Sequence, residues 1–164
     1  VDGSYWDEHK VASKHRPCLS PRYKKRVERI SSDFFMQPPA GERFRTVRDA
    51  LFDLPDPQLS DGGFKNHEFR SGARPYPGHT GSLLDEPSKA LKAGDHGVPG
   101  GENMMAFVDG SYRYYTVRES ARIQTFPDDY VFSGSWTESM RQIGNAVPVK
   151  LANLVGGSIQ RQVA

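Results

Sequence analysis

The sequence predicts an α+β fold, in which a loop-rich region with short antiparallel strands is followed by a helical C-terminal segment. The 164 residues include 16 glycines and 12 prolines, and the mean hydropathy is −0.67, as expected for a chain rich in loops. From residue 116 onward, helix-capping residues and apolar residues recur at helical spacing. We therefore expect two parts, a loop-rich region over residues 1–115 and a helical segment over residues 116–164.

Positive charge is concentrated near the N-terminus. Residues 10–29 hold eight basic side chains against one acid, Glu28, although the formal net charge of the whole chain is only +2. Such a cluster can attract phosphate groups. Pro17 and Pro21 interrupt helical structure here, and residues 23–30 are expected to form a short helix.

Composition excludes several classes of protein. The single cysteine, Cys18, cannot form an internal disulfide and fits a reducing, cytoplasmic location. The five histidines show no recognised metal-ligand spacing with it, so no metal site is predicted. No apolar run approaches the ~18 residues that a membrane-spanning helix needs. We therefore expect no membrane association.

Turn and strand signals fill the region before residue 116. A turn is expected at 38–41, and Thr46 with Asp49 three residues later predicts a short helix over 46–52. Residues 55–82 indicate an extended loop. Short strands are predicted at 88–93, 104–108 and 112–116, with Asp109 and Gly110 forming the tight turn of a hairpin between the last two.

Three helices are predicted after residue 115. Thr116 and Glu119 have the spacing of a capping box, in which each side chain bonds the backbone N–H of the other residue, and Pro127 is expected to end this helix. Ser135 and Glu138 repeat the spacing for a second helix that ends near residue 143. Pro148 suits the first turn of a third helix, with apolar residues at helical spacing: Leu151, Ala152, Val155 and Ile159. The aromatic residues over 112–136 are better explained as core than as a surface that stacks on unpaired bases.

Two polar clusters lie in this helical segment. The first consists of Arg118, Glu119, Arg122 and Gln124, which fall within two helical turns and could bind phosphate, form an internal ion-pair network, or do both. The second covers residues 144–148, where Gly144 is expected to allow the positive φ of a helix end and Pro148 opens the next helix. On spacing alone, the second cluster is a helix stop.

These residues closely resemble the ninth and tenth motifs of the DNA (cytosine-5)-methyltransferases. The ninth motif is Thr-x-Arg-Glu-x-Ala-Arg-x-Gln-x-Phe-Pro, and residues 116–127 match every fixed position. The tenth is Gln-x-Gly-Asn-x-Val-Pro, which residues 142–148 match. The resemblance is strong over 116–159, moderate over 45–57 and 78–115, and weak before that. It implies scaffold roles for seven residues: Arg118, Glu119, Arg122, Gln124, Gln142, Gly144 and Pro148.

The resemblance also implies what the chain lacks and which cofactor it serves. The family's nucleophile lies in a Pro-Cys-Gln string and its methyl-donor site begins at Phe-x-Gly-x-Gly, and neither string occurs here. Pro17-Cys18 is followed by Leu19, so Cys18 is not expected to be the nucleophile and no catalytic residue is assigned. By resemblance, the tenth motif completes the S-adenosylmethionine pocket of the whole enzyme. Its cofactor-binding residues here would be Asn145, Ala146 and Val147.

Glycine-rich loops precede the ninth motif, over residues 78–82 and 93–103. Taken alone they are ordinary loops, but loops with few side chains also let a backbone approach DNA. Their position resembles the family's target-recognition domain, whose loops face the groove and hold the flipped cytosine out of the duplex. The resemblance thus implies double-stranded DNA as partner and these DNA-binding residues: Arg74, His79, Thr80, Gly81, Lys89, Lys92, His96, Gly97, Gly100 and Gly101.

We interpret the chain, which begins at Val1, as the C-terminal part of a methyltransferase that modifies C5 of cytosine, and we expect the whole enzyme to serve restriction-modification. It would select the DNA sequence and complete the cofactor pocket, together with an N-terminal catalytic domain or a separate catalytic subunit. Alone, it is expected to be inactive. Two alternatives remain: the DNA-binding subunit of a naturally split methyltransferase, and a relative that binds DNA without methylating it.

Overall fold

The computed structural model describes residues 4–16, 21, 24, 25, 28, 43–93, 100, 101 and 103–163. The chain divides into two compact units, Val1–Arg43 and Phe44–Ala164. Several sequence predictions fall wholly or partly outside the described residues. These are most of the helix over 23–30, the turn at 38–41, Cys18, three residues of the basic cluster (Arg22, Arg26 and Arg29), and the loop residues His96 and Gly97.

The first unit is described in part. It contains helix α1 (Ser4–Glu8) and a 3₁₀ turn, η1 (Ser13–His15). Arg16 joins the two, because its Nη2 donates to the Asp7 carboxylate and its Nε to the Val11 carbonyl, both at 2.8 Å. This contact fixes the local path of the chain around η1.

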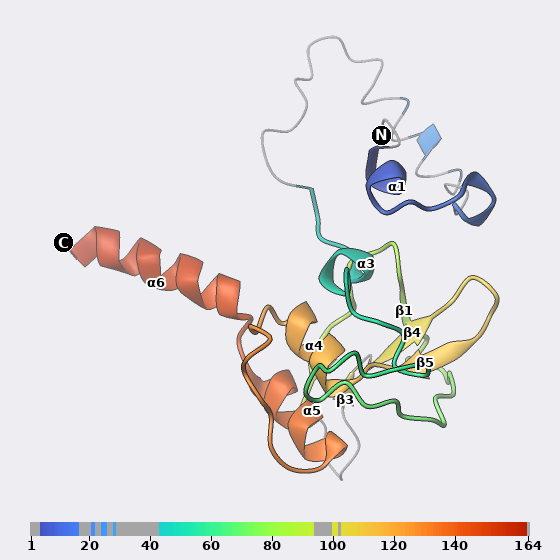
Figure 1. The fold of residues 1–164 in the computed structure, drawn as a ribbon. Helices are drawn as coiled ribbons and strands as arrows, with labels where there is room; N and C mark the ends of the chain where they lie inside the picture. The colour runs from blue at the N-terminus through green and yellow to red at the C-terminus, as the bar shows by residue number, and fades with distance from the viewer. Residues whose placement is uncertain are drawn as a thin grey trace. The chain divides into compact units, whose positions relative to one another are not determined.

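The second unit contains two small sheets (Figure 1). The first has the order β1 (Ser82–Leu83), β4 (Met104–Ala106), β5 (Tyr112–Tyr114), in which β4 and β5 form the predicted antiparallel hairpin. The second pairs β2 (Leu91–Lys92) with β3 (Gly100–Gly101), also antiparallel. The pair of β1 and β4 is parallel, which the sequence did not predict because a two-residue strand shows no alternation.

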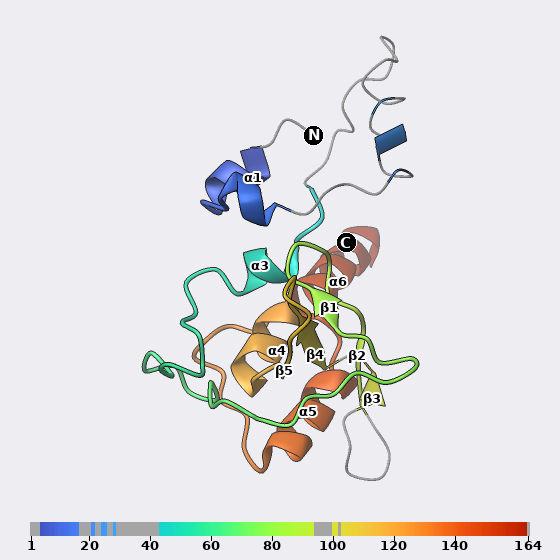
Figure 2. The ribbon, with the colours of Figure 1, turned by 90° about the vertical axis from the view of Figure 1, so that its right-hand side faces the viewer.

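Four helices complete this unit: α3 (Val47–Ala50), α4 (Val117–Ile123), α5 (Trp136–Asn145) and α6 (Val149–Val163). The capping boxes predicted at Thr46 and Thr116 both form, with each side chain bonding the backbone of the other residue. In Figure 2, α4 and α5 lie together, and α5 also contacts β2. Strands and helices are mixed in one unit, so the predicted α+β class is confirmed.

Three local predictions were wrong in detail. Helix α4 ends at Ile123, before the Phe-Pro pair, and Thr125 takes a positive φ of 60° in the turn that follows. The box at Ser135 is only half formed, because the Glu138 carboxylate accepts from Arg141 and not from the backbone of Ser135. Gly144 does not have positive φ and lies within α5. The expected loop over 55–82 is confirmed up to the start of β1.

The core lies between the sheet and the helices. Its buried members come from α3, β2, β4, α4, α5, the residue after β5 and the loop before α5: Val47, Leu91, Met105, Tyr115, Val117, Ala121, Phe132, Met140 and Ile143. The aromatic residues divide between core and surface. Tyr115 and Phe132 are buried, whereas Tyr130 is 49% exposed and packs its ring on Phe126 and Phe132.

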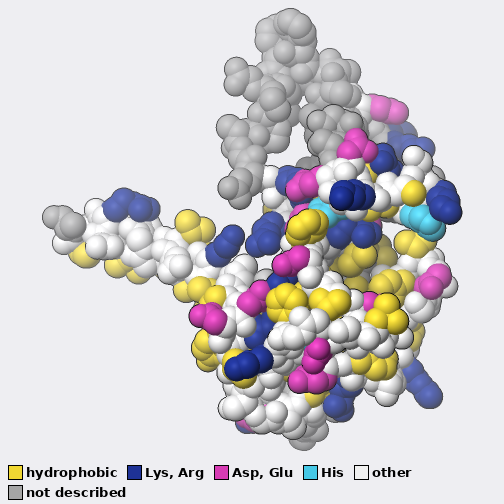
Figure 3. Space-filling model, viewed as in Figure 1, with side chains coloured by type: hydrophobic (Ala, Val, Ile, Leu, Met, Phe, Trp, Pro, Cys, Tyr) yellow, Lys and Arg dark blue, Asp and Glu magenta, His cyan; other side chains and the backbone are white. Residues whose placement is uncertain are grey.

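Helix α6 differs from the others because it buries none of its side chains. It leads away from α5 in Figure 1, and apolar side chains lie along it in Figure 3. Among the helices of the described residues, α6 included, none has the length and apolar character needed to cross a membrane.

Candidate functional site

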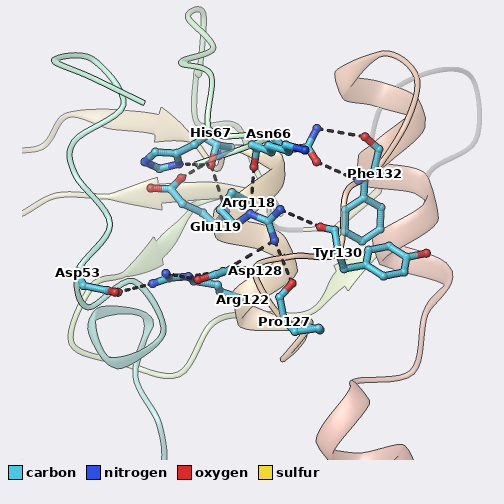
Figure 4. Close-up of polar contacts among 12 residues, drawn as sticks. Asp53, Asn66, His67, Arg118, Glu119, Arg122, Pro127, Asp128, Tyr130 and Phe132 are labelled. Atoms are coloured by element: carbon cyan, nitrogen blue, oxygen red, sulfur yellow. Dashed lines mark hydrogen bonds and ion pairs between the residues drawn. The ribbon is translucent and has the colours of Figure 1, made fainter. Parts of the chain in front are cut away.

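Arg118 is the centre of a buried polar network in which α4 meets two loops (Figure 4). Its side chain is fully buried, and its guanidinium donates to three backbone carbonyls: Lys65 at 3.0 Å, Pro127 at 3.2 Å and Tyr130 at 2.8 Å. Burial lowers the pKa of Arg118 from its ordinary value, and attraction to Asp128 opposes that shift. One side chain therefore fixes both loops to α4.

Asn66 completes the same junction. Its backbone carbonyl accepts from the Arg118 N–H at 2.7 Å. Its side-chain amide makes a reciprocal pair with the backbone of Phe132, donating at 3.1 Å and accepting at 2.9 Å. Asn66 has a positive φ of 65°, a conformation that asparagine tolerates better than most residues. The loop at residue 66 and the loop at residue 132 are thus joined directly.

Glu119 forms a buried ion pair with Arg113 of β5. Two parallel hydrogen bonds of 2.7 and 2.8 Å join them, and the side chains are only 8% (Arg113) and 2% (Glu119) exposed. Glu119 also accepts from the backbone N–H of Thr116, which is the capping box itself. Sequence reasoning missed Arg113. The available signal was strand alternation, since Arg113 points to the opposite face of β5 from its tyrosine neighbours.

His67 is a second residue that the sequence did not single out. It is fully buried, with Nε2 2.9 Å from the carbonyl oxygen of Pro55 and Nδ1 2.9 Å from Oγ1 of Thr116. A carbonyl oxygen can only accept, so Nε2 carries the proton and Nδ1 accepts from the threonine hydroxyl. His67 thereby attaches the loop after α3 to the start of α4.

Arg122 extends the network to the surface. It donates to both carboxylate oxygens of Asp128, at 2.8 and 2.5 Å, and to Asp53 at 2.5 Å. Its guanidinium also lies over the ring of Phe64. Every guanidinium nitrogen of Arg118 and Arg122 therefore donates a hydrogen bond inside the protein. This geometry favours the ion-pair alternative over phosphate binding.

Asp128 should make stability depend on acid pH. Hydrogen bonds from Arg122 lower the pKa of Asp128 below the ordinary value of an aspartate, so its contribution to stability is fully present above that ordinary value and is lost as pH falls through the lowered pKa. We expect Asp128→Asn to cost less than about 1 kcal/mol at pH 7, because the side chain is 41% exposed, and less at pH 3, where the unfolded chain already binds the proton. Urea unfolding at both pH values measures this. Asp129→Asn is the control, and an equal cost for Asp128→Asn at both pH values would contradict the assignment.

The segment over residues 144–148, which holds the end of α5 and the link to α6, is kept in place by two glutamines. Gln124 accepts from the Val149 N–H at 3.1 Å through its backbone carbonyl, and its side-chain amide donates to the Ile143 carbonyl at 3.4 Å. Gln142 donates to the carbonyl of Ser133 at 3.1 Å. These bonds fix the end of α5 relative to the start of α6.

Asn145 is the last residue of α5, and Ala146 and Val147 lie in the short link to α6. Asn145 is exposed, Ala146 is partly buried, and Val147 is 61% exposed. An open cavity of about 400 Å³ lies nearby between α3 and the start of α6, but no residue of 144–148 lines it. An exposed amide beside an exposed apolar side chain fits one wall of a site for a partly polar ligand. These residues do not by themselves enclose a site.

The candidate DNA-binding residues fall into two groups. Lys92, Gly100 and Gly101 belong to the hairpin of β2 and β3, which packs on the end of α5. The others lie in or beside the segment that leads into β1: Arg74, His79, Thr80, Gly81 and Lys89. Arg74, Thr80 and Lys89 are exposed, whereas Gly81 is buried against β4. No group of His, Cys, Asp or Glu among the described residues could hold a metal ion.

Comparison with known proteins gives a family match and several relatives. The family model described as C-5 cytosine-specific DNA methylase matches residues 43–161. A type II methyltransferase, M.MthTI from Methanothermobacter thermautotrophicus, is 31% identical over 99% of this chain and 58% of its own length. M.Eco47II from Escherichia coli is 60% identical over 47 residues, which are 29% of this chain and 11% of that protein. The chain thus spans little more than half the length of the first relative and much less of the second.

Proposed function

The chain belongs to the C-5 cytosine-specific DNA methylases, and on that premise we propose that it recognises duplex DNA and completes the S-adenosylmethionine pocket of a methyltransferase. The catalytic cysteine would come from a part of the enzyme outside these 164 residues. One observation carries the proposal. Gln124 fixes the end of α5 to the end of α4, and exposed cations lie in the segment that leads into β1, so one compact unit carries both candidate surfaces.

S-adenosylmethionine supplies the methyl group in this chemistry, and the chain would contribute one wall of its site. Asn145 offers an amide that can donate and accept hydrogen bonds, and Val147 offers apolar surface. The remaining walls would come from the catalytic part. Gln124 and Gln142 act as positioning residues, because they fix both ends of the loop without facing the ligand.

Helix α6 supports the existence of a catalytic partner. Four exposed apolar residues recur along one side of it: Leu151, Leu154, Val155 and Ile159. A 15-residue helix that buries none of its side chains gains little from tertiary packing, and short isolated helices are marginal in water. We propose that the catalytic part of the enzyme covers this stripe, either as an N-terminal domain or as a separate subunit.

The DNA target would be a cytosine turned out of the duplex. The reacting atoms of a stacked base are inaccessible to an active site, so enzymes of this kind extrude it into a pocket. This chain would hold the flanking duplex through its cationic loops while the catalytic part receives the base. The similarity to type II methyltransferases supports the further proposal that the whole enzyme serves restriction-modification.

The test is reconstitution. We expect the purified chain to shift duplex DNA on a native gel, with affinity that falls steeply as salt rises, and to transfer no labelled methyl group from S-adenosylmethionine. Adding the polypeptide that carries the Pro-Cys-Gln string should give methylation of cytosine in the same duplex.

The outcomes separate the alternatives. Methylation by the chain alone would show that the nucleophile is present after all. DNA binding with no methylation, when every candidate catalytic polypeptide has been supplied, would favour the relative that binds without methylating. Failure to bind duplex DNA at low salt would refute the recognition role.

A further inference from the structure

A long exposed segment of the second unit contains cations but no acid. Residues 69–84 include Arg70 and Arg74 and no aspartate or glutamate, and almost all of residues 69–80 are exposed. Arg70 is held over the indole of Trp136 at 4.3 Å, and Arg74 has no hydrogen bond or ion pair with any described residue. A surface of this composition is complementary to a polyanion.

The segment contains a tight turn on which two aromatic rings lie against each other. Tyr76 and His79 exchange backbone hydrogen bonds of 3.0 and 2.8 Å across Pro77 and Gly78. Proline fixes φ at the first central position, and Gly78 supplies the positive φ of 88° that the second requires. The rings of Tyr76 and His79 lie 4.2 Å apart, and Tyr76 remains 52% exposed.

The base of the turn is fixed to the sheet. Gly81 has a φ of +73°, and a Cβ there would lie 3.1 Å from the backbone nitrogen of Ala106 in β4. Thr80 accepts a hydrogen bond from the Lys89 ammonium group at 2.5 Å. Because the turn is closed by its own backbone bonds and its C-terminal end is fixed to the sheet, the two rings are presented in one orientation at little further cost in conformational entropy.

We propose that Tyr76 is a specificity-determining residue that contacts base edges in the major groove of duplex DNA. Arg74 and Lys89 lie before and after it in the sequence and contact the phosphate backbone. Backbone contacts position a protein on DNA, whereas contacts to base edges determine which sequence it selects. The inference rests on the recognition role proposed above and adds to it a residue outside the glycine-rich loops.

The probe is a pool of duplexes with a randomised central region, from which the full 164-residue chain selects by binding and sequencing. Wild type should enrich one motif. Tyr76→Ala should weaken discrimination at one or more motif positions by about 10-fold while general affinity for DNA changes little. Arg74→Gln should instead weaken binding to all duplexes alike and reduce the salt slope by about one.

Phe44→Ala is the matched control, because Phe44 is an aromatic residue that is 87% exposed and lies outside the segment. Phe44→Ala should leave the selected motif unchanged. Tyr76→Phe tests whether the tyrosine hydroxyl contributes to the contact with the bases. A motif that Tyr76→Ala leaves intact would overturn the assignment of Tyr76 while the recognition role stands. Binding without any enriched motif would overturn both. Circular dichroism melts establish that each variant is folded.

Discussion

Replacing Arg118 with methionine is expected to lower the free energy of unfolding of the second unit by about 3–5 kcal/mol. The methionine would fill much of the volume but leave the carbonyls of Lys65, Pro127 and Tyr130 without their donor. Small domains have about 5–15 kcal/mol of stability in total, so the loss would be a large fraction of it. Urea unfolding monitored by circular dichroism gives the value directly.

Arg141→Met is the matched control for this substitution. Like Arg118, Arg141 lies on a helix, but its partner is Glu138 and its side chain is 55% exposed. The loss of unfolding free energy should therefore be below about 1 kcal/mol. Arg118→Lys should recover little of the stability, because a single ammonium group cannot reproduce the planar fork that reaches three carbonyls. Similar costs for Arg118→Met and Arg141→Met would contradict the structural role given to Arg118.

Local features were predictable from the sequence because their partners are near in the chain. Thr46 and Thr116 each lie three residues before an acid, and that spacing alone specifies the capping box that forms. The hairpin of β4 and β5 follows in the same way from the turn at Asp109 and Gly110. The short parallel pair of β1 and β4 has no such local signal.

The site was predictable only in part, because its partners are far apart in sequence. The ninth motif drew attention to Arg118 and Glu119, but nothing in it identifies the carbonyl of Lys65, 53 residues away, as an acceptor for Arg118. His67 is 49 residues from Thr116. A buried histidine and an exposed one look alike in sequence, and only the fold distinguishes them.

Gly144 shows how a correct residue can be predicted for the wrong reason. The sequence suggested a helix stop with positive φ, but Gly144 lies inside α5. A Cβ at this position would lie 2.3 Å from the backbone nitrogen of Ala93 and 2.3 Å from the carbonyl carbon of Lys92. The glycine is required because α5 approaches β2 more closely than any side chain allows.

Gly144→Ala is therefore expected to destabilise the second unit by roughly 3 kcal/mol or more, at the upper end of what overpacking costs. In an exposed helix the same change would stabilise by about 0.5–1 kcal/mol, because alanine loses less backbone entropy than glycine. The contact atoms here belong to the backbone of β2, so no side-chain rotation can relieve the clash. Thermal and urea unfolding should show a clear loss.

Gly156→Ala in α6 is the control with the opposite expected sign. A Cβ at Gly156 meets nothing within 4 Å, so the substitution should leave stability unchanged or raise helix content.

If α5 separated from β2 to admit the Gly144→Ala methyl group, Asn145 would move relative to Lys92 of the hairpin, since Asn145 is the next residue along α5. Loss of stability for Gly144→Ala, with no loss for Gly156→Ala, would show why this motif carries a glycine. The reason would be close packing between helix and hairpin, and not a helix stop.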